Sequence, residues 1–235
     1  MYTKTEFIAM IQTALKAPDT LYNESCFNYT GEVGGERYTE IAARELLTKD
    51  NLNILRFGIQ QINRKNYKTA SHETLAKQPR PEGSDRDEEW IAKELYGKML
   101  NCIGKIIDFQ TPLKSVRADA ASKIDLLSYN EDTKTAYMLE LKKPESPETL
   151  LRCILEAFTY SMIINPPNLG RSFGLSNVDL RPAILVFEDC QAYKDFHYKR
   201  FHTQGANVRQ LLYKLGLDFF VLNSTYDKVI ERWPN

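Results

Sequence analysis

Two carboxylates and one ammonium group stand at positions that a β-hairpin would bring together. Asp125 lies in the apolar run 122–129, and Glu140 and Lys142 lie in a second run, 135–142. The polar residues 130–134 between the runs are typical of a turn. Because side chains alternate between faces along a strand, Glu140 and Lys142 must share one face.

The geometry of the turn determines whether Asp125 joins them. If Asp132 and Thr133 form a two-residue turn, Asp125 lies directly across from Glu140. Opposed side chains have Cβ atoms about 5 Å apart, so two ionised carboxylates repel unless a proton or a cation separates them. Carboxylate, water and phosphate oxygens are the usual ligands of Mg²⁺. The hairpin therefore predicts a site for Mg²⁺ or Mn²⁺ beside an ammonium group, which suits phosphodiester hydrolysis by metal-activated water.

This arrangement resembles the PD-(D/E)xK nuclease superfamily, whose members share the restriction-endonuclease-like fold. The resemblance is carried by residues 124–127, residues 139–142 and the helix that follows them, and it spans roughly residues 85–190. It implies that Asp125, Glu140 and the backbone carbonyl of Leu141 bind the metal ion. It also implies that Lys142 is the catalytic lysine.

The chain departs from the family pattern at two positions. Ile124 occupies the position of the proline for which the family is named, a position that varies among its members. Many members carry a glutamine four residues before a tyrosine on the next helix, and here Glu156 precedes Tyr160 at that spacing. Together with Arg152 these side chains form a polar row that faces either the metal site or solvent.

A further acidic ligand is expected from the first core helix, which lends a glutamate to the metal site in many relatives. Glu88 precedes Ile91 and Leu95 by three and seven residues, which places it on the apolar stripe of that helix. Glu88 is therefore the candidate and Glu94 the alternative. Acidic residues in the first turn of a helix are also favoured by the helix dipole. The alternative interpretation is that Glu88 only helps to start this helix and has no role in a metal site.

The acidic-x-Lys motif at 140–142 is short, and its charged residues could also have a purely structural role. Asp132-Thr133-Lys134 is a second acidic-x-Lys triplet, which reads as turn residues. Asp125, Glu140 and Lys142 would form an exposed salt-bridge cluster of little energetic value if the sheet face were solvated. The apolar neighbours of the first triplet favour a central strand, where unneeded charges are usually excluded.

Composition indicates a globular protein without a strongly basic field. The chain has 235 residues, 43% hydrophobic and 26% charged, with a formal net charge of +0. Four scattered cysteines show neither metal-ligand nor disulfide spacing. We expect a cytoplasmic location and no membrane contact, since no apolar run approaches about 18 residues and a signal peptide is lacking.

Contact with nucleic acid must therefore come from local patches. Residues 49–80 carry a surplus of five positive charges, which could meet a phosphate backbone or form a solvated face. Residues 193–202 interleave aromatic and basic side chains, a mixture that can stack on bases but also suits an amphipathic helix. Lys114, Arg117 and Lys123 are further candidates for substrate contact.

The chain is expected to fold as α/β, with a restriction-endonuclease-like mixed central sheet flanked by helices and an N-terminal helical extension. The extension covers 1–84 and the nuclease-like domain 85–235. The pattern predicts helices over 5–16, 38–47 and 208–215, a helix from about Trp90, one from Pro147 with Ser146 as N-cap, and strands near 106–109, 182–187 and 219–222.

The function expected from these features is a metal-dependent nuclease that acts on nucleic acid, in the first place DNA. The alternative is a catalytically inactive module of the same fold that binds nucleic acid or a protein partner. A homodimer and a subunit that is active only with a nuclease partner are also compatible with the sequence.

Overall fold

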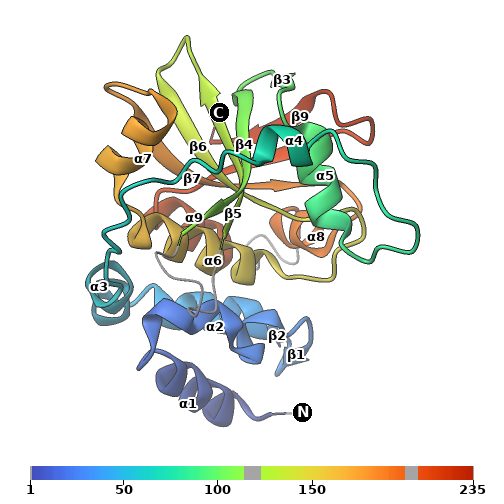
Figure 1. The fold of residues 1–235 in the computed structure, drawn as a ribbon. Coiled ribbons are helices and arrows are strands. Elements are labelled where there is room, and N and C mark those ends of the chain that lie inside the picture. Colours follow the sequence, from blue (N-terminus) through green and yellow to red (C-terminus); the bar gives the residue numbers. More distant parts are fainter. Residues whose placement is uncertain (1, 114–122, 199–205, 235) are drawn as a thin grey trace.

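The computed structural model describes residues 2–113, 123–198 and 206–234. They form a mixed α/β fold around one seven-stranded sheet, in which the strands lie side by side in chain order (Figure 1). The strands are β3 (Met99–Leu100), β4 (Gly104–Pro112), β5 (Lys123–Asn130), β6 (Thr135–Leu141), β7 (Asp179–Val186), β8 (Asp218–Leu222) and β9 (Val229–Trp233).

The connections explain the mixed character of the sheet. Strands β3 to β6 form an antiparallel meander, whereas β6, β7 and β8 are parallel and β9 is antiparallel to β8. Parallel neighbours need a crossover, and helices supply it. The helices around the sheet are α5 (Asp87–Leu95), α6 (Leu150–Ile163), α7 (Pro166–Phe173), α8 (Gln191–Phe196) and α9 (Ala206–Lys214). The predicted element order is confirmed, while β3, β9, α7 and α8 were not predicted.

Each face of the sheet is covered by its own hydrophobic cluster. All seven residues of β6 are buried, as expected for a central strand with helices on both sides. Met138 belongs to the cluster under α6, and its neighbour Leu139 to the cluster under α5. This alternation places Glu140 and Lys142 on the α6 side of the sheet.

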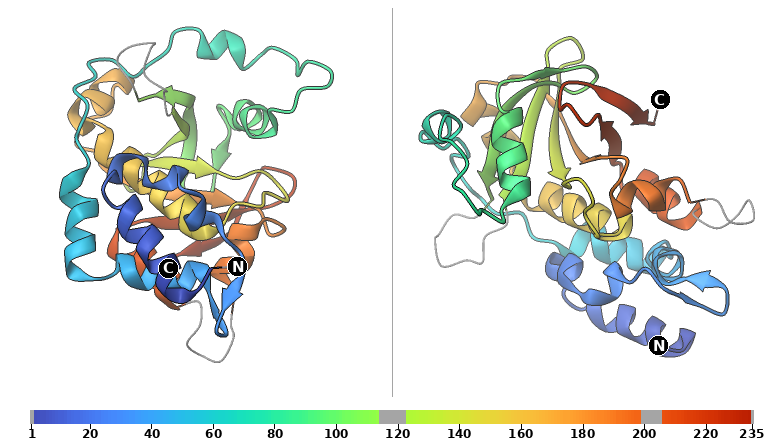
Figure 2. Two further views of the ribbon diagram at one scale, coloured as in Figure 1. Left: turned by 90° about the horizontal axis from the view of Figure 1, so that it is seen from below. Right: turned by 90° about the vertical axis from the view of Figure 1, so that its right-hand side faces the viewer.

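The N-terminal part of the chain is helical and packs on the α6 side (Figure 2). Its elements are α1 (Lys4–Ala14), the 3₁₀ turns η1 (Pro18–Asn23) and η2 (Ser25–Asn28), the short strands β1 (Glu32–Val33) and β2 (Glu36–Arg37), α2 (Tyr38–Leu46) and α3 (Lys49–Gly58). The two helices predicted here are confirmed. Phe7 and Ile41 share one buried cluster with Ile154 of α6, so the extension completes the core beneath the sheet. The boundary at residue 84 stays a prediction.

The start of α6 differs from the prediction. The helix begins at Leu150 with Thr149 as N-cap, so the prediction of Ser146 as N-cap and Pro147 as first helical residue is wrong. Thr149 is held by the extension: its hydroxyl donates to the Phe27 carbonyl at 2.6 Å, and its N–H donates to the Asn28 side chain at 2.8 Å. These long-range bonds select the later capping residue.

Several predicted features lie outside the described residues. Lys114 and Arg117 fall in 114–122, and part of the aromatic and basic stretch falls in 199–205. The four cysteines are free thiols. In the described ranges, every helix is too short or too polar to cross a membrane.

We expect the buried ion pair between Arg37 and Asp195 to be essential for attaching the extension. Arg37 Nη2 lies 2.5 Å from Asp195 Oδ1, and Asp195 Oδ2 accepts the N–H of Leu150 at 3.0 Å. Asp195→Ala leaves a buried guanidinium unpaired and should lower the free energy of unfolding by about 3–5 kcal/mol in urea denaturation. The exposed control Asp132→Ala should change it by less than about 0.5 kcal/mol. A loss below about 1 kcal/mol in Asp195→Ala would contradict this role.

Candidate active site

The β5–β6 hairpin has the predicted register. Leu126 pairs with Leu139 and Asn130 with Thr135. Residues 131–134 connect the strands, so the prediction of a two-residue turn is wrong. The Asn130 side chain accepts N–H groups of the turn at 3.1 and 3.2 Å, which stabilises the longer connection. The register is unchanged because the turn gains one residue from each strand.

The Lys142 ammonium group lies at the centre of a cluster of carboxylates. Its Nζ is 2.7 Å from Glu140 Oε1, and both residues are only 4% exposed. The same nitrogen is 2.8 Å from Glu148 Oε2 and 3.6 Å from Glu156 Oε2. The predicted placement of Glu140 and Lys142 on one face is therefore confirmed. Glu148 lies just before α6, and no sequence motif indicated that it would join the cluster.

Asp125 is held beside this cluster by two hydrogen bonds. Its Oδ2 accepts the backbone N–H of Leu141 at 3.0 Å, and its Oδ1 accepts the Gln110 amide at 3.0 Å. Leu141 thus brings its backbone directly against Asp125, next to Glu140. The sequence did not predict that Gln110 would contact Asp125. This contact depends on β4 lying next to β5, which only the strand order of the sheet shows.

The glutamate candidate of α5 also reaches the site. Glu88 Oε1 accepts the N–H of Lys143 at 3.2 Å, which places it next to the end of β6. Glu94 is exposed and pairs with Lys98 at 3.3 Å instead. Of the two candidates, the geometry brings only Glu88 to the cluster.

The polar row of α6 faces the cluster as well. The Tyr160 hydroxyl donates to Glu156 Oε1 at 2.6 Å, while the other oxygen of Glu156 faces Lys142. Arg152 Nε lies 3.6 Å from Glu148 Oε2. The question of whether this row faces solvent or the site is thereby decided in favour of the site.

A cleft of about 490 Å³ opens beside these side chains. Lys143 closes part of it, since its Nζ lies 2.7 Å from Asp87 Oδ2. The lining is mostly acidic. It consists of Asp85, Arg86, Asp87, Glu88, Glu89, Gln110, Asp125, Lys143, Ser146, Pro147 and Glu148. Asp125 and Glu148 are thus accessible from the cleft, with Glu140 and Lys142 behind them.

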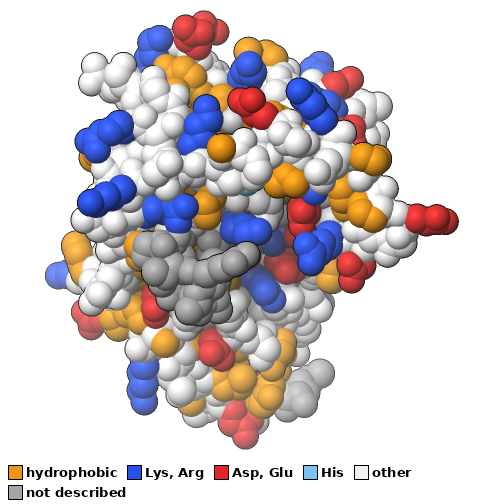
Figure 3. All heavy atoms as spheres, viewed as in Figure 1, with side chains coloured by type: hydrophobic (Ala, Val, Ile, Leu, Met, Phe, Trp, Pro, Cys, Tyr) orange, Lys and Arg blue, Asp and Glu red, His pale blue; other side chains and the backbone are white. Residues whose placement is uncertain are grey.

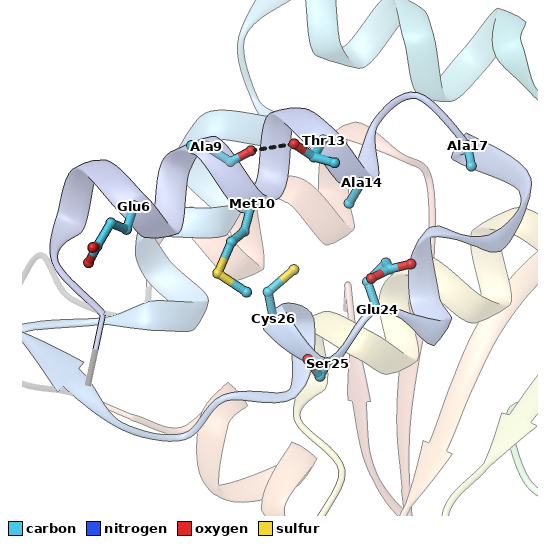
Figure 4. Close-up of a pocket in the computed structure, with 9 residues that line it drawn as sticks. All are labelled: Glu6, Ala9, Met10, Thr13, Ala14, Ala17, Glu24, Ser25 and Cys26. Atoms are coloured by element: carbon cyan, nitrogen blue, oxygen red, sulfur yellow. Dashed lines mark hydrogen bonds between the residues drawn. The ribbon is translucent and has the colours of Figure 1, made fainter.

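A second cavity, of about 470 Å³, lies between α1 and η2 (Figure 4). Alanines, Met10 and Cys26 form much of its wall. Among the residues that line it, the charged ones are Glu6 and Glu24, so it offers no cation to a phosphate group. The cleft at Asp125 is the better candidate for phosphodiester chemistry.

Burial and mutual repulsion disturb the protonation of the cluster. Burial, Glu156 and Glu88 raise the pKa of Asp125 to about 7, although Lys142 and the Leu141 N–H oppose the rise. The pKa of Glu140 is raised well above its ordinary value by burial and then by Asp125 and Glu156. Burial alone would lower the pKa of Lys142, but the surrounding carboxylates, Glu140 first, raise it. When Asp125 and Glu140 are both ionised, negative charge in the cluster exceeds positive charge, which is the condition that a bound cation relieves.

The residues fit a hard divalent cation by their chemistry. Asp125 and Glu140 supply carboxylate oxygens, and the backbone of Leu141 lies against Asp125. In the described parts of the chain, no three His, Cys, Asp or Glu side chains group closely enough to hold an ion. Two carboxylates remain sufficient for Mg²⁺, which keeps several waters and takes other ligands from substrate phosphates.

Comparison of the chain with models of protein families, with curated proteins and with solved structures found no significant match.

We expect Asp125 to destabilise the metal-free protein at alkaline pH. A carboxyl group with a pKa of about 7 in the folded state and about 4 when unfolded lowers stability as pH rises from 4 to 7, and the penalty persists above 7. In EDTA, Asp125→Asn should therefore raise Tm by about 3 °C or more at pH 8, by roughly a third as much at pH 5, and little at about pH 3, where the carboxyl group is protonated in both states. Asp132→Asn in the exposed turn is the matched control. An unchanged or lower Tm at pH 8 would contradict the prediction.

Proposed function

We propose that the protein is a Mg²⁺- or Mn²⁺-dependent nuclease of the restriction-endonuclease-like fold that hydrolyses phosphodiester bonds in DNA. One observation carries the proposal: Asp125 lines an acidic cleft, and the Glu140–Lys142 ion pair from the end of the neighbouring strand lies directly behind it. The antiparallel meander, the α6 crossover and the parallel strand β7 support the fold assignment.

The metal ion would be held by Asp125, Glu140 and the carbonyl of Leu141. When bound, it would supply Lewis acidity, lowering the pKa of a water molecule and neutralising phosphate charge. Glu88 borders the same cleft and could accept a hydrogen bond from water there. The binding of an ion requires Asp125 and Glu140 to lose their protons, so their raised pKa values make loading favourable at neutral to alkaline pH.

Lys142 would stabilise the negative charge that develops on the phosphate. Its ammonium group is held from three sides by Glu140, Glu148 and Glu156, which fixes it and keeps it charged. Engagement of Glu140 by a metal ion would remove one of these partners. Lys142 would then be turned toward Glu148, which lines the cleft where a phosphate enters.

One observation favours the alternative of an inactive nuclease-fold module. The Lys142 ammonium neutralises part of the charge of Glu140 and Glu148. If this contact is permanent, the site is a buried ion cluster, and the cleft serves binding alone.

Cleavage of labelled DNA in Mg²⁺ or EDTA separates these functions. We expect Mg²⁺-dependent cleavage that falls about 100-fold or more in Lys142→Ala, because a charge-stabilising group is lost. Lys228→Ala, at an exposed lysine elsewhere, should cleave normally. Calorimetric titration with Mn²⁺ should show binding in the wild type and in Lys142→Ala, and none in Asp125→Asn.

Two results would count against the nuclease. Cleavage that persists in Lys142→Ala and Asp125→Asn would place the chemistry elsewhere or in a contaminant. DNA binding without cleavage and without Mn²⁺ binding would favour the inactive module.

A further inference from the structure

A long segment between α3 and α5, residues 59–81, runs across one side of the molecule and is called the strap here. It contains one short helix, α4 (His72–Leu75), and otherwise no regular structure. In Figure 1 it leaves α3, passes α7, crosses beside β4 and leads to α5. The strap therefore ends at the helix that forms one wall of the acidic cleft.

The first half of the strap is fixed to α6 and α7. The N–H of Ile62 donates to the Ile163 carbonyl at 2.7 Å. Tyr67 is fully buried; its hydroxyl accepts the N–H of Asn165 at 2.9 Å, and its own N–H donates to Ser172 Oγ at 3.0 Å. A buried aromatic side chain with these bonds gives this half a defined position.

The second half is fixed to the open edge of β4. His72 Nδ1 lies 2.6 Å from Asp108 Oδ1, and its ring stacks on Phe109 at 4.7 Å between centroids. Thr111 donates to the other oxygen of Asp108 at 2.7 Å. Near the cleft, Arg80 bonds to Asp87, which also binds Lys143. The strap is thus anchored at three places along its length.

Between the anchors the strap presents lysines to solvent. It carries five basic residues against one acidic residue, Glu73. Lys65, Lys68 and Lys77 are exposed, and in the described part of the chain none of them pairs with a carboxylate. Figure 3, in the same view, shows Lys and Arg side chains spread across this face. Exposed cations without carboxylate partners are able to neutralise the phosphates of a polyanion.

The cleft itself cannot attract a polyanion. Its lining has six carboxylates, including Asp125 and Glu148, against two basic residues, Arg86 and Lys143. The chain as a whole has a formal net charge of +0 and supplies no general attraction. Affinity for a nucleic acid must therefore come from cations outside the cleft that lead toward it.

We propose that the strap is the phosphate-backbone track of this protein, which holds nucleic acid through Lys65, Lys68 and Lys77 and delivers it to the cleft. The proposal deepens the proposed nuclease function and rests on it for the nature of the ligand. In this proposal the strap provides the affinity for nucleic acid, and the cluster around Lys142 carries out the hydrolysis.

The triple variant Lys65→Ala, Lys68→Ala, Lys77→Ala tests the track. Binding of short fluorescent DNA, as duplex and as single strand, is measured by anisotropy in EDTA over a range of salt concentrations. We expect the triple variant to bind about tenfold or more weakly than the wild type. The slope of log Kd against log salt should fall by about 2–3 units, since each lost phosphate contact removes roughly 0.7–0.9.

The matched control replaces three exposed lysines away from the strap, Lys105, Lys214 and Lys228, by alanine. It makes the same change in net charge and should bind with nearly the wild-type salt slope. Equal weakening in both triple variants, or no DNA binding by the wild type, would overturn the proposal. Circular dichroism and Tm verify that each variant is folded.

Hydrolysis of a small phosphodiester, bis(p-nitrophenyl) phosphate, separates the strap from the proposed chemistry. This probe has no backbone to hold, so the strap variant should hydrolyse it as the wild type does while Lys142→Ala does not. If the strap variant binds DNA more weakly, this result supports the track. If Lys142→Ala leaves hydrolysis of the small phosphodiester unchanged, that result contradicts only the nuclease assignment.

Discussion

The buried cluster around Lys142 is the constraint on which the rest of the structure depends. One ammonium group faces Glu140, Glu148 and Glu156, with Asp125 close by, in a region where water is largely excluded. Such a cluster tolerates little displacement, because a buried charge without its partner costs several kcal/mol. The sheet, α6 and the extension together hold its members in place.

The extension contributes to this rigidity from a distance. It caps α6 through Thr149 and supplies Arg37 as the partner of Asp195, which in turn holds the first turn of α6. Glu148 lies immediately before that turn, and Glu156 lies two turns into the helix. Contacts from η2 and β2 of the extension therefore help to fix the start of α6 against the sheet, which brings both glutamates to Lys142.

The distribution of charge fits the two tasks proposed for the cleft and the strap. The cleft concentrates carboxylates, which suit a cation and repel phosphate, whereas the strap concentrates lysines on an anchored backbone. Arg80 and Lys143 meet on Asp87 at the junction of the two regions. A neutral chain can thereby present both an acidic centre and a basic approach to it.

The sequence by itself determined the hairpin, because side chains alternate with period two. The register followed only on the assumption of a two-residue turn. The observed turn takes one more residue from each strand, and this symmetric change leaves the pairing intact. The sequence also placed Glu140 with Lys142. The family resemblance led us to expect a glutamate from the first core helix, and helical spacing favoured Glu88. Only the tertiary structure decided that Gln110 and Glu148 join the site, that α6 starts at Leu150, and that the row with Glu156 faces inward. These features arise from contacts between segments far apart in the chain. Local periodicity shows which face of a helix or strand is apolar, but it does not show which distant segment that element will pack against.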